Sequence, residues 1–68
     1  MKAGETTERA WFRWKRDGRV LMRLPGPAAE LNGISCVPVQ ALQFPFGTGY
    51  IPSHDEVERY DLNFVRVT

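Results

Sequence analysis

A hairpin signal over residues 10–24 constrains the fold of this chain more than any other stretch. The segment reads AWFRWKRDGRVLMRL. In it, Arg16-Asp17-Gly18 separates two halves, each of which contains both apolar and cationic residues. Glycine adopts the left-handed backbone conformation that many hairpin turns need. We therefore predict a three-residue loop in which Gly18 is the residue of a β-bulge.

The register of this hairpin decides which side chains share a face. In the predicted register Trp14 is opposite Val20, whereas a two-residue Asp17-Gly18 loop would mix apolar and charged groups. The predicted apolar face carries Ala10, Phe12, Trp14, Val20, Met22 and Leu24. The other face carries Leu21 and five residues that we define as the basic hairpin face: Trp11, Arg13, Lys15, Arg19 and Arg23.

The rest of the sequence predicts a mainly β fold at the border of the α+β class. Apolar, β-branched stretches predict strands near 34–39 and 62–67. The sequence Ser53-His54-Asp55-Glu56 has the cap residue and the acids of a helix start, so we expect one short helix near 54–60. Together with the hairpin 10–24, these elements form a small antiparallel sheet or a partly open barrel.

The length of 68 residues predicts a single small domain, 1–68, with a thin core. Residues 1–7 are polar and lack a period, so we expect a flexible tail there. The only cysteine, Cys36, has no partner for an internal disulfide, and one Cys with one His does not suit a zinc site. We therefore expect no metal or cofactor, and the thin core favours association into a homodimer.

Residues 44–52, FPFGTGYIP, form the second informative stretch. Two prolines and two glycines in nine residues predict a loop or a broken edge strand. The stretch carries three aromatic residues that we define as the loop aromatics: Phe44, Phe46 and Tyr50. They either cover the open end of the core, which a small protein favours, or form an exposed interaction patch.

The charge of the chain is nearly balanced overall but unevenly distributed. The net charge is +1, yet residues 1–24 hold seven Lys or Arg against three acids, and residues 25–68 hold two against five. Domains that bind nucleic acid usually carry a strongly basic balance. A protein partner is therefore favoured over nucleic acid.

The sequence offers no combination of residues that predicts an enzyme. Cys36 lies in an apolar strand, where a thiol is normally an inert small hydrophobe. His54, Asp55 and Glu56 would point in different directions on a helix, so they do not predict a metal or catalytic site. The chain also lacks an apolar run of membrane-spanning length and the apolar core of a signal peptide, so we expect a cytoplasmic protein.

These observations predict a non-enzymatic binding protein that acts by occupying a surface of a larger protein. Its size suits a small regulator or inhibitor of the kind that phages and bacteria encode. We expect the basic hairpin face to bind the partner and the loop aromatics to form a secondary interaction patch. The alternative is a nucleic-acid-binding protein, in which the cations neutralise phosphates and Trp11 stacks on a base. In a third interpretation, the basic hairpin face is simply the solvated side of a half-buried sheet.

Overall fold

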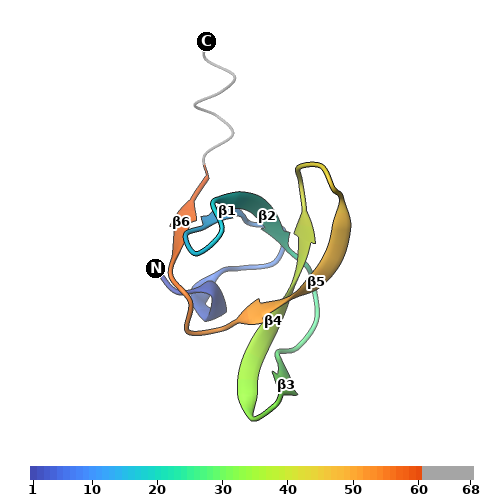
Figure 1. The fold of residues 1–68 in the computed structure, drawn as a ribbon. Helices are drawn as coiled ribbons and strands as arrows, with labels where there is room; N and C mark the ends of the chain where they lie inside the picture. Colours follow the sequence, from blue (N-terminus) through green and yellow to red (C-terminus); the bar gives the residue numbers. More distant parts are fainter. Residues whose placement is uncertain (61–68) are drawn as a thin grey trace.

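The computed structural model describes residues 1–60, which form one curved antiparallel sheet preceded by a short 3₁₀ turn (Figure 1). The elements are η1 (Ala3–Glu5), β1 (Trp11–Trp14), β2 (Arg19–Arg23), β3 (Ala29–Leu31), β4 (Ile34–Ala41), β5 (Gly47–Pro52) and β6 (Val57–Arg59). The order in the sheet is β3-β4-β2-β1-β6, and β5 pairs with β4. The prediction of a mainly β, antiparallel fold is confirmed, and the sheet does not close into a barrel.

Strand β4 is the centre of the sheet because it pairs with three other strands. Along one edge it pairs with β5, and along the other edge it pairs first with β3 and then with β2. Pro38 lies where the partner changes, and its carbonyl accepts a hydrogen bond from the backbone N–H of Leu24 at 3.0 Å. The N–H that proline lacks falls in this gap between partners, so a proline is tolerated inside the strand. The predicted strand near 34–39 is confirmed and continues to Ala41.

Strands β1 and β2 form the predicted hairpin, but the predicted register is wrong by one residue. Trp14 is opposite Arg19, and Phe12 is opposite Leu21. Leu21 therefore lies on the core side and is 4% exposed, whereas Met22 is only half-buried. A shift of one residue moves every side chain of one strand to the other face, so the predicted faces of β2 are exchanged.

The turn of this hairpin is one residue longer than the sequence predicts. Residues 15–18 form a four-residue loop, in which the carbonyl of Trp14 accepts hydrogen bonds from the N–H groups of Asp17 and Gly18, at 3.2 and 2.6 Å. Gly18 has a φ of 77°, so the prediction of a left-handed glycine at this position is confirmed. Including Lys15 in the loop shifts the pairing of both strands.

The core lies on the concave side of the sheet, where residues from all parts of the described chain meet. Trp14 is partly buried and packs against this core. The core side chains are Ala3, Phe12, Leu21, Val37, Val39, Ala41, Ile51 and Val57. Since this cluster is small, residues from outside the central strands are needed to complete it.

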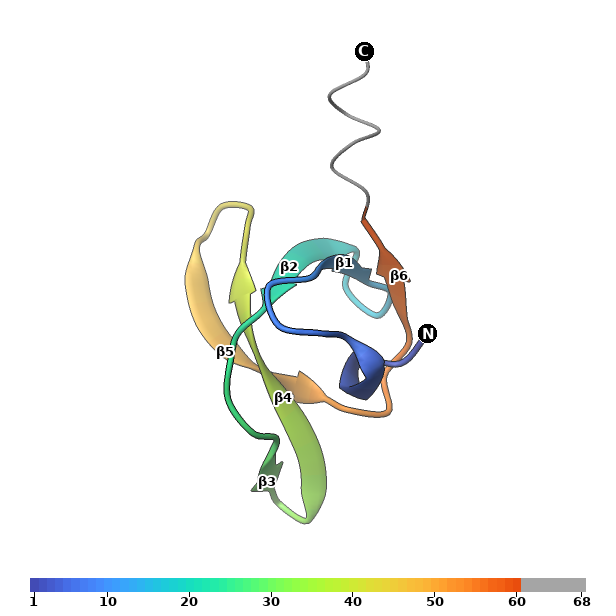
Figure 2. The same ribbon diagram turned by 180° about the vertical axis from the view of Figure 1, so that it is seen from behind.

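Residues 1–7 do not form the tail that the sequence predicts. Ala3 is fully buried, and its N–H donates to the carbonyl of Asp55 at 2.9 Å. The N–H of Gly4 donates to the carbonyl of Ser53 at 2.8 Å. Figure 2 shows η1 beside the segment that joins β5 to β6, so the amino terminus covers an end of the core.

The helix predicted near 54–60 is absent, because residues 53–56 form a turn and Val57–Arg59 is strand β6. Strand β6 pairs with β1, with Val57 opposite Trp14. Burial of Val57 in the core stabilises an extended conformation that the local helix-start motif does not predict. The predicted strand at 62–67 lies outside the described residues.

Part of the 44–52 stretch is also more regular than the sequence predicts. Gly47–Pro52 forms β5 and pairs with β4 over six residues, from Gly47 opposite Ala41 to Pro52 opposite Cys36. Only the residues before Gly47 form a loop. No helix within residues 1–60 has the length and apolar character needed to cross a membrane.

Candidate functional site

The structure divides the basic hairpin face between the two sides of the sheet. Because Trp14 is opposite Arg19, the side chains of Arg19 and Arg23 lie on the same side as Leu21. Trp11 and Arg13 alternate with the core residues of β1, and Arg13 is exposed. The predicted partner-binding residues therefore do not make one continuous surface.

The two arginines of β2 are held by oxygen atoms of neighbouring segments. Arg23 Nη1 donates to the carbonyl of Thr6 at 2.9 Å and to its Oγ1 at 3.3 Å. Arg19 Nη2 donates to the carbonyl of Pro45 at 2.7 Å. These contacts give Arg23 a structural role at the amino-terminal segment and place Arg19 beside the β4–β5 loop.

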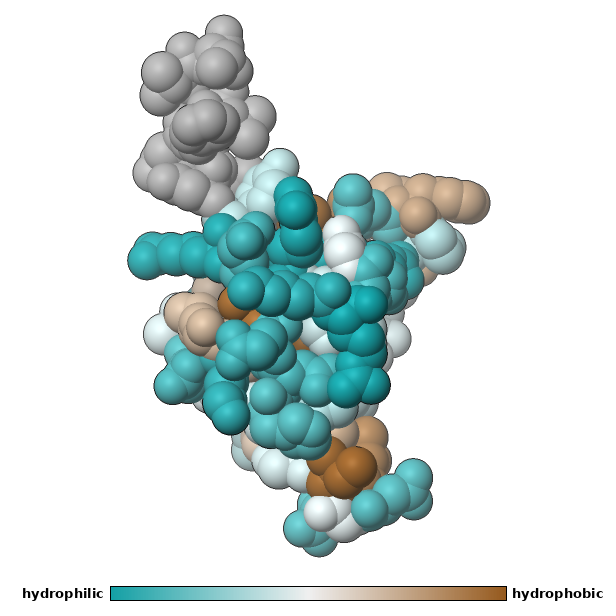
Figure 3. Space-filling model, turned by 60° about the vertical axis from the view of Figure 1, so that its left-hand side comes forward, coloured by the Kyte–Doolittle hydropathy of each residue, from teal (hydrophilic) through white to brown (hydrophobic). Residues whose placement is uncertain are grey.

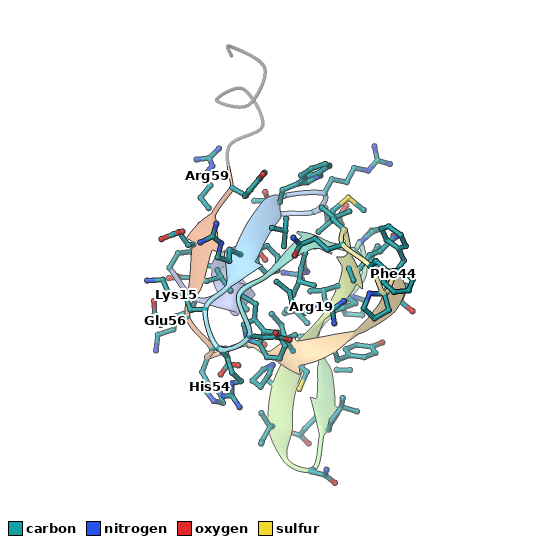
Figure 4. All side chains as sticks on the ribbon, turned by 45° about the horizontal axis from the view of Figure 1, so that its top comes forward. Lys15, Arg19, Phe44, His54, Glu56 and Arg59 are labelled. Atoms are coloured by element: carbon teal, nitrogen blue, oxygen red, sulfur yellow. The ribbon has the colours of Figure 1, made fainter. Side chains whose placement is uncertain are left out.

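Acidic residues of β6 and the preceding turn lie beside Arg13 of β1 and Lys15 of the hairpin loop. Arg13 Nη1 is 4.0 Å from Glu58 Oε1, and these residues are opposite each other in the β1–β6 pair. The N–H of Lys15 donates to the carbonyl of Glu56, and Figure 4 shows these two residues on adjacent segments. This side of the hairpin therefore mixes charges of both signs, as a solvated sheet face does.

Asp55 belongs to the turn before β6, and its carboxylate is buried against the hairpin. It is 6% exposed and accepts hydrogen bonds from Trp14 Nε1 at 2.9 Å and from Arg16 Nη2 at 2.8 Å. His54 Nε2 is 3.7 Å from the same carboxylate. The sequence predicts Asp55 in a short helix and does not reveal this role, because both hydrogen-bond partners are distant in sequence.

A groove of about 300 Å³ opens on the concave side between the β1–β2 hairpin and β5. Its floor includes Leu21, Val39 and Ala41, and Trp14 lies on its wall. Among residues 1–60, Arg19 is the only charged residue that lines it. Its lining is thus mainly apolar, with a single positive group at one side.

Two glycines leave this groove open. In the β4–β5 pair, Gly47 is opposite Ala41 and Gly49 is opposite Val39, so both face the concave side. A Cβ atom added at either glycine would have no other atom within 4 Å. The hollow therefore occupies the space that side chains on β5 would fill in an ordinary strand.

The loop aromatics are exposed and do not cover the core. Phe44 is 86% exposed, Phe46 is 69% exposed and Tyr50 is 52% exposed. Phe44 and Phe46 contact each other edge to face, with ring centroids 6.3 Å apart. Phe46 and Tyr50 line the groove, so the interpretation of these aromatics as a cover for the core is wrong.

A smaller apolar patch lies at the tip of the β3–β4 hairpin, which Figure 3 shows projecting from the body of the protein. Leu31 is 45% exposed and Ile34 is 42% exposed. They flank the tight turn at Asn32-Gly33, where both residues have positive φ. Neither residue is predicted from the sequence as an interaction residue, and neither lines the groove.

The groove is the main candidate for a functional site among residues 1–60. No group of three or more His, Cys, Asp or Glu residues in this range is placed to hold a metal ion. Cys36 is buried, and its Sγ lies 3.5 Å from the carbonyl of Ile34. No protein-family model, curated protein or solved structure matches the chain.

Proposed function

We propose that this protein is a non-enzymatic binding protein that acts by occupying a surface of a larger protein, as a regulator or inhibitor. The exposure of Phe44, Phe46 and Tyr50 carries this proposal, because Phe46 and Tyr50 line an apolar groove and Phe44 contacts Phe46. Large aromatic side chains in rigid surroundings are the residues that contribute most to the free energy of binding at protein interfaces.

The arrangement of these aromatics supports docking more than a core function. A small protein gains stability from each aromatic ring that it buries, yet this chain leaves three rings exposed in one region. Adjacent exposed apolar side chains of this kind are typical of sites where another molecule binds. The loop aromatics therefore become the principal docking surface in this proposal, and the basic hairpin face becomes secondary.

Nucleic-acid binding by the basic hairpin face is the alternative and has less support. Arg13 lies beside Glu58, and Arg19 and Arg23 face the side of the sheet opposite to Arg13. Phosphate binding needs several cations on one surface, and affinity then falls steeply as salt concentration rises. A binding measurement at two salt concentrations separates this alternative from a mainly apolar protein contact.

The proposal is tested by affinity capture from the native host with the immobilised 68-residue protein. We expect a specific protein to be retained by the wild type and lost when Phe44, Phe46 and Tyr50 are all changed to Ser. All three side chains are more than half exposed, so the variant should keep its fold. The intrinsic fluorescence of Trp11 and Trp14 and the urea midpoint of unfolding check that the variant is folded.

A matched control changes Leu31 and Ile34 to Ser, because these are also exposed apolar residues but lie at the β3–β4 tip. This control should retain the captured protein. Equal capture by the wild type and the aromatic variant would contradict the proposal. Capture of nucleic acid alone, lost at high salt, would support the alternative instead.

A further inference from the structure

The outer edge of β5 carries backbone groups that no strand of the described chain pairs. The N–H of Leu42 donates to Val20 on the β2 side of β4, and the carbonyl of Pro38 accepts from that side as well. Backbone groups alternate in direction along a strand, so the odd-numbered residues of β4 pair with β5. The hydrogen bond from Ser53 N to the carbonyl of Ser35 agrees with this alternation.

In this pattern Gly47, Gly49 and Ile51 bond to β4, and Thr48 and Tyr50 direct their N–H and C=O groups outward. Within residues 1–60, β5 pairs with β4 alone, and no other backbone hydrogen bond involves Thr48 or Tyr50. Pro52 then ends the free edge, because it has no N–H to donate. The free edge of β5 is therefore short and borders the groove.

We propose that the free edge of β5 binds an extended apolar segment of the partner protein, which adds a strand to the sheet and places side chains in the groove. This inference rests on the proposed function and specifies the kind of segment that is bound. Main-chain hydrogen bonds to Thr48 and Tyr50 supply affinity, and the hollow beside Gly47 and Gly49 selects side chains. Alternate residues of an added strand point to the concave side, where the hollow lies.

The positive charge in the groove indicates which charge the partner segment carries. In the described part of the chain, Arg19 is the only charged residue of the lining, and its hydrogen bond to the carbonyl of Pro45 holds its guanidinium beside the loop. The partner segment therefore carries one carboxylate that faces Arg19, next to its apolar residues. Pairing with the β5 edge of a second copy does not fit this chemistry, because β5 has no acid and each copy brings its own Arg19.

The first test uses a displayed library of random ten-residue peptides and the whole 68-residue protein as bait. We expect the selected peptides to alternate apolar residues and to contain one Asp or Glu. Exchange of this acid for its amide should weaken binding about tenfold in the wild type and leave binding unchanged in Arg19→Ser. Failure to select any such peptide would overturn the proposal.

The second test fills the hollow. Gly49→Val should abolish binding of the selected peptide, because the added side chain extends into the groove from a Cβ position that has open space around it. Thr48→Val is the matched control, since it places the same side chain on the opposite face of β5 and should keep binding. Peptide binding that persists in folded Gly49→Val would overturn the proposal.

The third test measures amide hydrogen exchange at the free edge of β5. Bound peptide should slow exchange at Thr48 and Tyr50 by about tenfold or more and leave the exposed turn residue Asp17 unchanged. Protection of both amides in the free protein, together with a doubled mass, would show that a second copy occupies the edge and would overturn the proposed occupant.

A protein captured from the host separates this inference from the proposed function. If Gly49→Val and the wild type retain the protein equally, while the triple Ser variant of the loop aromatics loses it, the docking function stands and the added-strand mode fails. If no host protein is retained but the peptide results hold, the groove is supported and the proposed function fails in that host.

Discussion

The indole Nε1–H of Trp14 donates to Oδ2 of Asp55 at 2.9 Å and thereby joins the β1–β2 hairpin to the turn before β6. The same carboxylate binds Arg16, which lies in the hairpin loop at 6.0 Å from the Trp14 ring. One buried acid thus fixes the position of the hairpin loop relative to the last described strand.

Asp55→Ala should lower the free energy of unfolding by about 1.5–3 kcal/mol, because it leaves the Trp14 indole N–H without its charged acceptor. Arg16 is 62% exposed in its side chain, so solvent replaces most of its contribution. Asp17→Ala, an exposed acid of the hairpin loop, is the control and should cost little. Urea unfolding with an unchanged m value measures both variants. An equal loss in the two variants would contradict the assigned role of Asp55.

The hairpin register predicts unequal costs for two neighbouring apolar residues. Leu21→Ala should destabilise the protein by about 2–5 kcal/mol, since Leu21 is 4% exposed and packs in the core. Met22→Ala should cost clearly less, because Met22 is half-buried and lies on the opposite face. Thermal and urea unfolding of the pair settle the register, and a larger loss at Met22 would favour the alternative pairing.

The packed amino terminus predicts a cost for a threonine near the start of the chain. Thr6 is 8% exposed, and its Oγ1 donates to the carbonyl of Ala3 at 2.6 Å and accepts from Arg23. Thr6→Ala should therefore lower the free energy of unfolding by about 1 kcal/mol or more. Thr7→Ala makes the same substitution at the exposed neighbouring residue and is the control. Indistinguishable urea midpoints for the two variants would indicate that residues 1–7 contribute nothing to the fold.

Two glycines with equally open surroundings should respond differently to alanine. Gly18 has a φ of 77°, and Gly47 does not have a positive φ, although neither has an atom within 4 Å of an added Cβ. Gly18→Ala should cost about 1–2 kcal/mol because of the left-handed backbone. Gly18→Asn should cost less, since asparagine tolerates this conformation. Gly47→Ala should be neutral or stabilising in the same unfolding assay, and a neutral Gly18→Ala would contradict the turn geometry.

The sequence predicts the hairpin itself but cannot decide its register. Val20, Leu21 and Met22 are three consecutive apolar residues, so alternation along β2 does not tell which of them faces the core. The register depends on whether Lys15 belongs to β1 or to the loop. In the structure Lys15 lies in a four-residue loop. The resulting register places Leu21 on the core side and puts Arg19 and Arg23 on the side of the sheet opposite to Arg13.

The other errors come from local motifs that long-range contacts override. Ser53 and Glu56 have the spacing of a helix start, yet burial of Asp55 and Val57 stabilises a turn and a strand. The glycines of β5 weaken a strand locally, but six paired residues on β4 hold it extended. The loop aromatics could be identified from sequence as a patch, whereas the groove beside them depends on strand pairing that no local pattern reveals.

The pairing of β6 with β1 also has a consequence for how this protein is made. Phe12 and Val57 are each 1% exposed and belong to one core cluster, although one lies near the start of the described chain and the other near its end. During translation Phe12 cannot reach its final burial until residues 57–59 have left the ribosome. Completion of the core must therefore follow synthesis of nearly all of residues 1–60, and until then the apolar side of the β1–β2 hairpin stays exposed.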